Sequence, residues 1–220
     1  MAFEASHTEV EARFLERALV PRAHVLDAGC GRRTRLDTRR NRIAELVGMD
    51  LDAAAGAENS TLDRFVVGDL CASLPFGSGY FDVVYANFVV EHLDRPEEAF
   101  REWRRVLRPD GVLILLTTNR ANPLVATARL APRTVRVAIK RAGAGVVERD
   151  VMPIRYRANT PWRLKALLSD AGFAPVEVMC VATLHLYAER VVFLARVLRV
   201  LERCFPPQLR STIVAWYRPT

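Results

Sequence analysis

The sequence has few cysteines and no long apolar run, and each of these features excludes a class of protein. Cys30, Cys71, Cys180 and Cys204 are scattered along 220 residues, with no Cys-x-x-Cys pair. This spacing predicts neither a disulfide framework nor a zinc site, and no metal site is expected. No run of 18 or more uncharged apolar residues is present, so no transmembrane helix is expected. The N-terminus lacks the basic start and apolar block of a signal peptide, which favours a cytoplasmic protein.

Acidic residues are scarce in one segment, and the positive charge of the chain is concentrated there. The net charge is +7, and residues 120–163 hold ten Arg or Lys against only two acids, Glu148 and Asp150. A solvated surface is the ordinary explanation of such an excess. It would also attract an acidic substrate, a nucleic acid or a lipid surface.

Apolar runs of strand length alternate with amphipathic helical stretches over most of the chain. Asp94 and Thr160 are expected to cap the helices that follow them, and Pro96 suits a first helical turn. Short, doubly apolar strands separated by helices predict a parallel sheet that is covered on both faces. The expected strands span residues 24–29, 44–50, 64–69, 80–87, 112–119, 175–182 and 211–218.

This alternation predicts a single α/β domain over residues 1–220, with two additions. Prolines and glycines interrupt the pattern between strands five and six, which predicts a basic lid insertion over 120–160. Residues 183–210 are expected to form a C-terminal helical segment before the last strand. Its helix, over 184–205, has a wide apolar stripe that suits packing in the core or the lid, with a lipid surface as the rarer alternative.

The loop VLDAGCGRRT, residues 25–34, has two glycines in G-x-G spacing, but Arg33 stands where a third glycine would be expected. The strand ends that follow carry acids. Asp50 lies 19 residues past Gly31, which suits an acid that binds a ribose, and Asp69 could meet the amine of an adenine.

The two arginines after the glycines suggest a ligand without phosphates. In a dinucleotide site the third glycine allows close packing of helix and strand beside a pyrophosphate. An amino-acid carboxylate at a helix start would instead benefit from free N–H groups and from the charges of Arg32 and Arg33. S-adenosylmethionine combines adenosine with an amino-acid tail and has no phosphate, so it is the cofactor that this loop predicts.

Several segments in order carry a resemblance to a known family: VLDAGCG, VGMDLD, FVVGDL, LPFGSGYFDVVYANFVVEHL and RVLRPDGVLILLTTN. Over about residues 24–119 the chain resembles the class I S-adenosylmethionine-dependent methyltransferases, in the broad small-molecule (type 11-like) group. The resemblance implies a three-layer, Rossmann-like sheet, mostly parallel with an antiparallel last strand, and a helical insertion after strand five.

The resemblance also implies roles for individual residues. The methionine end would be lined by Asp27, Gly29 and Gly31, with a backbone contact from Cys30. Asp50 would bind the ribose, Leu51 would pack on the adenine, Asp69 with Leu70 would meet the adenine amine, and Asn87 would lie near the sulfonium. The stretch RRTRLDTRRN departs from the family pattern, because Leu36 is its only apolar residue. The helix expected there is therefore short, irregular or poorly buried.

Residues for the transfer step are less clearly marked. His92 is the candidate general base because only histidine has an ordinary pKa near neutrality. The alternative is that Glu91 and His92 shape the loop after strand four. Tyr156 and Arg157 would face the acceptor or belong to the turn before the helix at 160. An acidic acceptor could be met by basic residues of the insertion, namely Arg129, Arg133, Arg136, Lys140 and Arg141.

The leading hypothesis is a methyltransferase for a small molecule, which could be a natural product, a quinone or a lipid-like compound. RNA or DNA methylation is the second hypothesis. Against it, strand four ends in Tyr-Ala-Asn-Phe rather than Asn-Pro-Pro-aromatic, and the basic segment has few aromatics for stacking on bases. The third hypothesis is a non-catalytic partner protein that binds the cofactor.

Overall fold

A computed structural model describes residues 6–128, 153–188 and 192–220. Their core is a seven-stranded sheet in the order β3-β2-β1-β4-β5-β7-β6. Strand β7 is antiparallel to both of its neighbours, and the other pairs are parallel, as predicted. The strands are β1 (Ala23–Ala28), β2 (Ile43–Asp50), β3 (Arg64–Val67), β4 (Phe81–Asn87), β5 (Leu107–Thr118), β6 (Phe173–Val181) and β7 (Thr212–Pro219).

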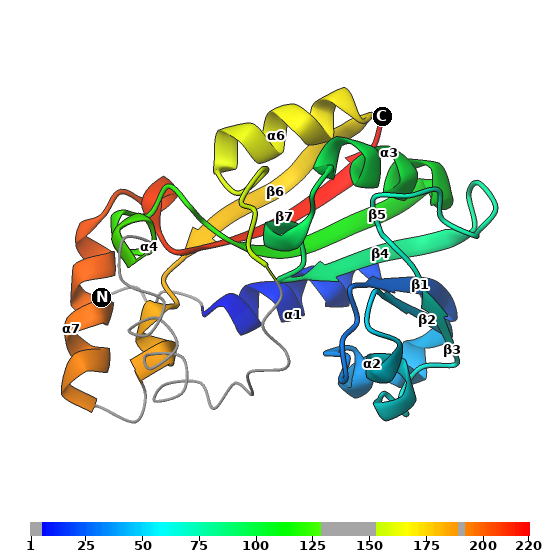
Figure 1. Cartoon of the computed structure of the whole chain (residues 1–220), viewed down its shortest axis with the longest axis horizontal. Coiled ribbons are helices and arrows are strands. Elements are labelled where there is room, and N and C mark those ends of the chain that lie inside the picture. The colour runs from blue at the N-terminus through cyan, green and yellow to red at the C-terminus, as the bar shows by residue number, and fades with distance from the viewer. Residues whose placement is uncertain (1–5, 129–152, 189–191) are drawn as a thin grey trace.

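Helices cover both faces of the sheet and make three layers, which confirms the predicted architecture. Figure 1 shows α3 and α6 on one face and α1 on the other. Phe100 and Trp103 of α3 are fully buried in one apolar core, and Phe14 of α1 is fully buried in the second. The helices are α1 (His7–Ala18), η1 (Asp37–Arg42), α2 (Ala53–Glu58), η2 (Val90–His92), α3 (Pro96–Val106), α4 (Pro123–Ala128), α6 (Pro161–Asp170), η4 (Leu184–Ala188), α7 (Val192–Cys204) and η5 (Pro207–Leu209).

The order of the strands places the switch point of the sheet between β1 and β4. The chain runs outward from β1 through β2 to β3, and then returns to the other side of β1 with β4. The loops that follow β1 and β4 therefore diverge at the carboxyl edge of the sheet. Ligands of open parallel sheets bind at such a switch point. This topology puts the glycine bend and Asn87 at the same edge.

The expected cap of α3 is wrong, whereas that of α6 is confirmed. The N-cap position of α3 is Arg95, which makes no side-chain capping bond, and the Asp94 carboxylate lies 2.8 Å from the Arg155 guanidinium instead. An ion pair with a distant segment thus replaces the local cap. Pro96 does begin α3, and the Thr160 hydroxyl accepts a hydrogen bond from the Arg163 N–H at 3.3 Å.

Within the stretch RRTRLDTRRN the only helix is the short 3₁₀ helix η1, which starts at Asp37, as the low apolar content of the stretch predicts. None of the residues of η1 is buried, while Leu36, just before it, is fully buried in the core beside α1. Several arginines here pair with acids on other elements, namely Arg35 with Glu11, Arg40 with Asp63 and, just after the stretch, Arg42 with Glu16 at 2.7 Å. The segment is thus attached by one apolar anchor and by surface ion pairs.

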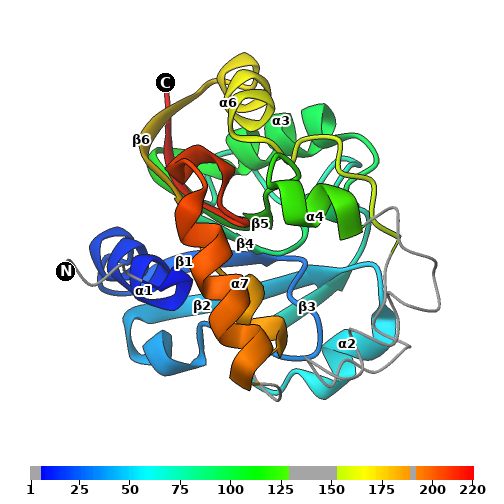
Figure 2. The same cartoon turned by 90° about the vertical axis from the view of Figure 1, so that its left-hand side faces the viewer.

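The basic insertion lies only partly within the described residues. The structure describes residues 120–128, which include α4, and residues 153–160 of the insertion. The basic residues expected to meet an acidic acceptor lie outside them, namely Arg129, Arg133, Arg136, Lys140 and Arg141. Figure 2 shows α4 and α7 at the end of the sheet where β4 and β5 finish.

The long helix expected over 184–205 is replaced in the structure by η4 and α7, and residues 189–191 between them lie outside the described part. Among the described residues of α7 only Glu202 is buried, and Phe193 is 79% exposed. Of the two kinds of packing expected for its apolar stripe, packing in the core is therefore wrong for the described residues, and packing in the lid stays a prediction. None of the described helices has the length and apolarity that crossing a membrane requires.

Candidate functional site

The glycine bend after β1 is pressed against the loop after β4. Gly29 and Gly31 have φ values of +76° and +53°, in the left-handed region that glycine adopts at no steric cost. A Cβ on Gly29 would lie 2.5 Å from Cγ2 of Val89, two residues past the end of β4. The bend therefore needs glycine at position 29 for two separate reasons, backbone conformation and close approach.

The N–H groups of the bend are not free, which corrects the expectation of a helix start that would bind a carboxylate. Gly29 and Cys30 donate to the Met49 carbonyl at 2.8 and 3.3 Å, and Gly31 donates to the Asp50 carboxylate at 2.9 Å. No helix begins at the bend, because η1 starts only at Asp37. The Cys30 N–H is thus bonded to β2, and the contact of the Cys30 backbone with the cofactor stays a prediction.

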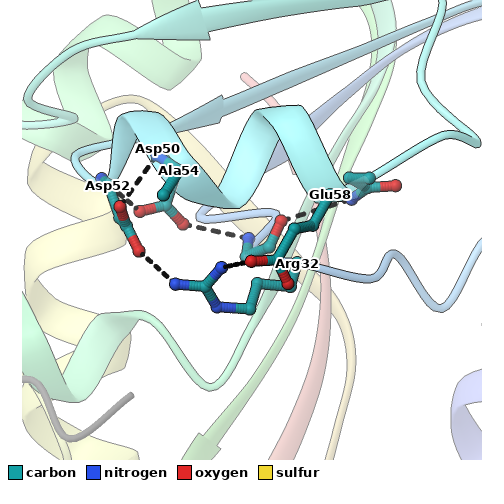
Figure 3. A network of polar contacts seen from close by, with 7 residues as sticks. Arg32, Asp50, Asp52, Ala54 and Glu58 are labelled. Atoms are coloured by element: carbon teal, nitrogen blue, oxygen red, sulfur yellow. Dashed lines mark hydrogen bonds and ion pairs between the residues drawn. The ribbon is translucent and has the colours of Figure 1, made fainter. Parts of the chain in front are cut away.

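Arg32 holds the bend to α2 and is not directed at an open anion site. Its guanidinium lies 3.0 Å from the Asp52 carboxylate and also pairs with Glu58, at the two ends of α2 (Figure 3). The side chain is 20% exposed. The expected help from Arg32 in binding an amino-acid carboxylate is therefore corrected, because neighbouring acids already neutralise its charge. Arg33 is exposed.

Asp50 is held rigidly at the end of β2, as Figure 3 shows. One carboxylate oxygen accepts from Gly31 N–H at 2.9 Å and the other from Asp52 N–H at 3.0 Å. A carboxylate offers about four acceptor positions, so about two remain for other donors. Leu51, the next residue, is 56% exposed. This arrangement can accept two hydroxyl groups beside an apolar surface.

Asp27 is a buried acid near the end of β1. Its side chain is 2% exposed, and Oδ2 has no hydrogen-bond partner among the described residues. Burial raises the pKa of this carboxyl to about 7, with smaller contributions from Asp50 and Glu11, against a hydrogen bond from Thr34 that lowers it. Binding of a cationic group to such an acid is favourable, because it compensates the free-energy cost of a buried, unpaired carboxylate.

Asn87 adds a second unsatisfied acceptor at the end of β4. Asp27 pairs in register with Tyr85, and Asn87 lies two residues further along the same strand. Asn87 Oδ1 is buried and, like Asp27 Oδ2, has no partner in the described part of the chain. Buried acceptors are normally satisfied, so two of them on adjacent strands at the switch point suit a ligand that carries N–H donors.

Asp69 lies at the other end of the predicted cofactor site, just after β3. One of its oxygens accepts from Cys71 N–H at 2.8 Å, and the other is 3.6 Å from the Arg95 guanidinium. The Asp69 side chain is 45% exposed, whereas Leu70 is 5% exposed. The carboxylate is thus open to a ligand, with an arginine beside it that the sequence pattern did not indicate.

Glu91 joins three segments through a buried hydrogen-bond network. Its carboxylate accepts from the hydroxyls of Thr117 and Thr118, at the end of β5, at 2.7 and 3.0 Å. Asn159 Nδ2 donates in turn to Thr117 Oγ1 at 2.6 Å. The shaping role considered for Glu91 therefore agrees with its contacts, which link the loop after β4, the end of β5 and the segment before α6.

His92 is fixed by a backbone carbonyl. Its Nδ1 lies 2.8 Å from the Pro153 carbonyl oxygen, which can only accept, so Nδ1 carries the hydrogen in this contact. In the neutral ring Nε2 is then the acceptor, which is the form a general base requires. The contact orients the ring and also attaches residue 153 to the loop after β4.

Two residues at this edge have backbone conformations that the sequence does not reveal. Phe88 and Tyr156 have φ values of +52° and +54°, unusual for residues with a large side chain. Phe88 N–H donates to the Leu116 carbonyl at 2.8 Å, and Tyr156 N–H to the Glu91 carbonyl at 3.1 Å. Such strain costs about 1–3 kcal/mol each and is typical of functional sites. Because neither residue is Gly or Asn, no sequence signal marks these positions.

Comparison with known proteins gives a family match and curated relatives for the first half of the chain. Residues 26–115 match the family described as "Methyltransferase domain". The malonyl-[acyl-carrier protein] O-methyltransferase of Enterobacter lignolyticus (strain SCF1) is 36% identical over 120 residues, which is 50% of this chain and 47% of that protein. The chain thus spans about half the length of the curated relatives it matches.

Solved structures match the fold over nearly the whole chain. A geranyl diphosphate C-methyltransferase from Streptomyces coelicolor A3(2), in complex with S-adenosyl-L-homocysteine, superposes with a TM-score of 0.63 at 19% identity, covering 96% of this chain and 77% of that one. The [4+2]-cyclase SpnF gives the same TM-score at 20% identity, covering 96% of this chain and 80% of that one. At such identities the likeness establishes the fold, and two different reactions share it.

Proposed function

We propose that the chain transfers a methyl group from S-adenosylmethionine to a small-molecule acceptor. The basis is that it belongs, by its fold and by the sequence of residues 26–115, to the class I S-adenosylmethionine-dependent methyltransferases. The observation that carries the proposal is the buried carboxylate of Asp27 at the switch point, with one oxygen lacking a partner among the described residues. It would receive the ammonium of the methionine end, beside the bend at Gly29 and the amide of Asn87.

The remaining cofactor contacts follow along the carboxyl edge of the sheet. Asp50 would receive the two ribose hydroxyls with the acceptor positions that Gly31 and Asp52 leave unused. Leu51 would cover one face of the adenine, and Asp69 with Leu70 would meet its amine. This set contains no cationic group for a phosphate at the ribose position, which favours adenosine over a phosphorylated nucleotide.

The chemical requirement on the protein is mainly one of position. S-adenosylmethionine supplies a methyl group that its sulfonium already activates, so the chain has to hold a nucleophile in line with it. The loop after β4 and the residues around Tyr156 and Arg157, joined by Glu91, would hold the acceptor. For a hydroxyl or an acidic carbon, Nε2 of His92 would take the proton.

Isotope transfer tests this function directly. We expect that the protein, incubated with a small-molecule extract of its source cells and S-adenosylmethionine labelled in the methyl group, produces a labelled compound detectable by mass spectrometry. Asp50→Ala should lower the rate by roughly 10-fold or more, because two charge-assisted hydrogen bonds to the cofactor are removed.

The matched control for this assay is Asp110→Ala, an exposed carboxylate at the start of β5. It should leave the rate of labelling unchanged. A wild-type incubation with no labelled product above a protein-free blank would contradict methyl transfer. Equal labelling by Asp50→Ala and wild type would contradict the assigned role of Asp50.

A further inference from the structure

A cavity of about 390 Å³ lies beside the predicted transfer site and is lined mainly by arginines. We call it the arginine pocket. It lies where α3 and α6 begin and β5 has just ended, at the edge of the sheet that also carries the glycine bend. Its lining residues are Glu97, Arg120, Arg155, Tyr156, Arg157 and Arg163.

The backbone around the arginine pocket is firmly held. Arg155 and Tyr156 both donate their N–H groups to the Glu91 carbonyl, at 2.7 and 3.1 Å. Arg120 N–H donates to the Asn159 carbonyl at 2.7 Å. Tyr156 keeps its left-handed conformation, at φ +54°, within this framework. A strained residue that is held by its neighbours indicates that the local geometry is specified rather than incidental.

The charge of the arginine pocket is unbalanced. Arg155 pairs with Asp94 at 2.8 Å, and Arg163 pairs with Glu97 at 3.2 Å. Within residues 6–128, 153–188 and 192–220, neither Arg120 nor Arg157 forms an ion pair. Among the described residues, four guanidinium groups thus face two carboxylates, which leaves two positive charges at one concave surface in this part of the chain.

We propose that the arginine pocket binds a compact oxyanion with two negative charges, a phosphate-type or dicarboxylate group carried by the methyl acceptor. Guanidinium groups present planar pairs of N–H donors that match carboxylate and phosphate oxygens. Two unpaired guanidinium groups match a dianion in charge. The pocket has one aromatic side chain, that of Tyr156, so it offers little of the stacking surface that nucleic acids require.

The arginine pocket would thus select methyl acceptors that carry an acidic group. This link to the acceptor rests on the proposed methyltransferase function, whereas binding of the anion does not. Arg157, one of the two residues predicted to face the acceptor, would contact the anion directly, and Arg120 would be its counterpart from the end of β5.

Calorimetry with simple dianions tests the arginine pocket. The full chain is titrated separately with inorganic phosphate and with malonate at low ionic strength and pH 8, where both are dianions, and S-adenosylhomocysteine is titrated as an independent ligand. We expect saturable binding of at least one dianion. Arg120→Gln combined with Arg157→Gln should weaken it by roughly 10-fold or more, because two charged hydrogen-bond donors are removed. The preferred dianion identifies the acceptor group as phosphate-type or carboxylate.

The matched control is Arg101→Gln combined with Arg199→Gln, which removes the same charge from two exposed helix positions outside the pocket. This double variant should bind the dianion as wild type does, and both double variants should bind S-adenosylhomocysteine normally. Equal weakening by the two double variants, or no dianion binding by wild type, would overturn the proposal. Failure of S-adenosylhomocysteine to bind would instead contradict the proposed function, so the two failures are distinguishable.

Discussion

Gly29→Ala is expected to weaken binding of S-adenosylhomocysteine by about 100-fold or more. Alanine at φ +76° costs about 1 kcal/mol, and its Cβ would lie 2.5 Å from Val89 Cγ2 and 2.8 Å from Val89 Cβ. Val89 cannot simply rotate away, since its Cβ is fixed to the backbone. The bend and the loop after β4 must therefore separate, and the two unsatisfied acceptors at Asp27 and Asn87 lose their relative position. Isothermal titration calorimetry measures the loss.

The chain contains a control that isolates the steric effect. Gly79 has a similar φ of +65°, but a Cβ there would have no atom within 4 Å. Gly79→Ala should lower the free energy of unfolding by about 1 kcal/mol and leave affinity for S-adenosylhomocysteine unchanged. If Gly29→Ala binds as tightly as Gly79→Ala does, contact between the bend and Val89 does not organise the site.

Asp27→Asn is expected to stabilise the fold and to weaken cofactor binding, two effects of opposite sign. The folded-state pKa of Asp27 is raised to about 7 from an ordinary 3.8, mainly by burial. This raised pKa contributes stability that is fully present below pH 3.8. The contribution is lost as the pH rises through 7, because the buried carboxyl of the folded state then ionises. At pH 8 the buried charge therefore costs up to about 4 kcal/mol, which the amide avoids. Urea denaturation should show the variant more stable than wild type at pH 8, with the difference shrinking toward pH 4.

The same substitution removes the charge that would hold the ammonium of the cofactor. At pH 7.5 the affinity of Asp27→Asn for S-adenosylhomocysteine should fall by roughly 10- to 100-fold, as for loss of a hydrogen bond to a charged group. Asp110→Asn, at an exposed position, is the control and should change neither quantity. A variant that is less stable than wild type at pH 8, or that binds S-adenosylhomocysteine equally well, would contradict the role given to Asp27.

Much of the fold was predictable because its signals are local. Apolar runs of strand length identified all seven strands, and the position of Asp50 after Gly31 placed both residues at the same edge of the sheet. The one-residue anchor of the RRTRLDTRRN stretch was also predictable, because Leu36 is its sole apolar side chain. These features depend on residues that are close in the sequence and on the general rules of parallel sheets.

The predictions that were wrong concern polar groups whose partners lie far away in the sequence. In each case a distant partner competes with the local role that the sequence suggested. Asp94 is an ordinary capping residue, yet it pairs with Arg155, 61 positions away. The N–H groups of the glycine bend were expected to be free, but Met49 and Asp50 of the neighbouring strand accept their hydrogen bonds. Arg32 looks like an anion ligand until Asp52 and Glu58 are placed beside it. Spacing along the chain does not encode such pairings.

The central claim is that the edge of the sheet between β1 and β4 recognises a phosphate-free adenosyl amino acid. Parallel calorimetric titrations of the wild-type chain with S-adenosylhomocysteine and with NAD test it most directly. The account predicts saturable binding of S-adenosylhomocysteine at one site per chain, at least about 100-fold tighter than any binding of NAD, because the N–H groups of the glycine bend are bonded to β2 and Arg32 is paired with Asp52 and Glu58, so neither is available to a pyrophosphate. Tighter binding of NAD, or no binding of S-adenosylhomocysteine, would contradict it.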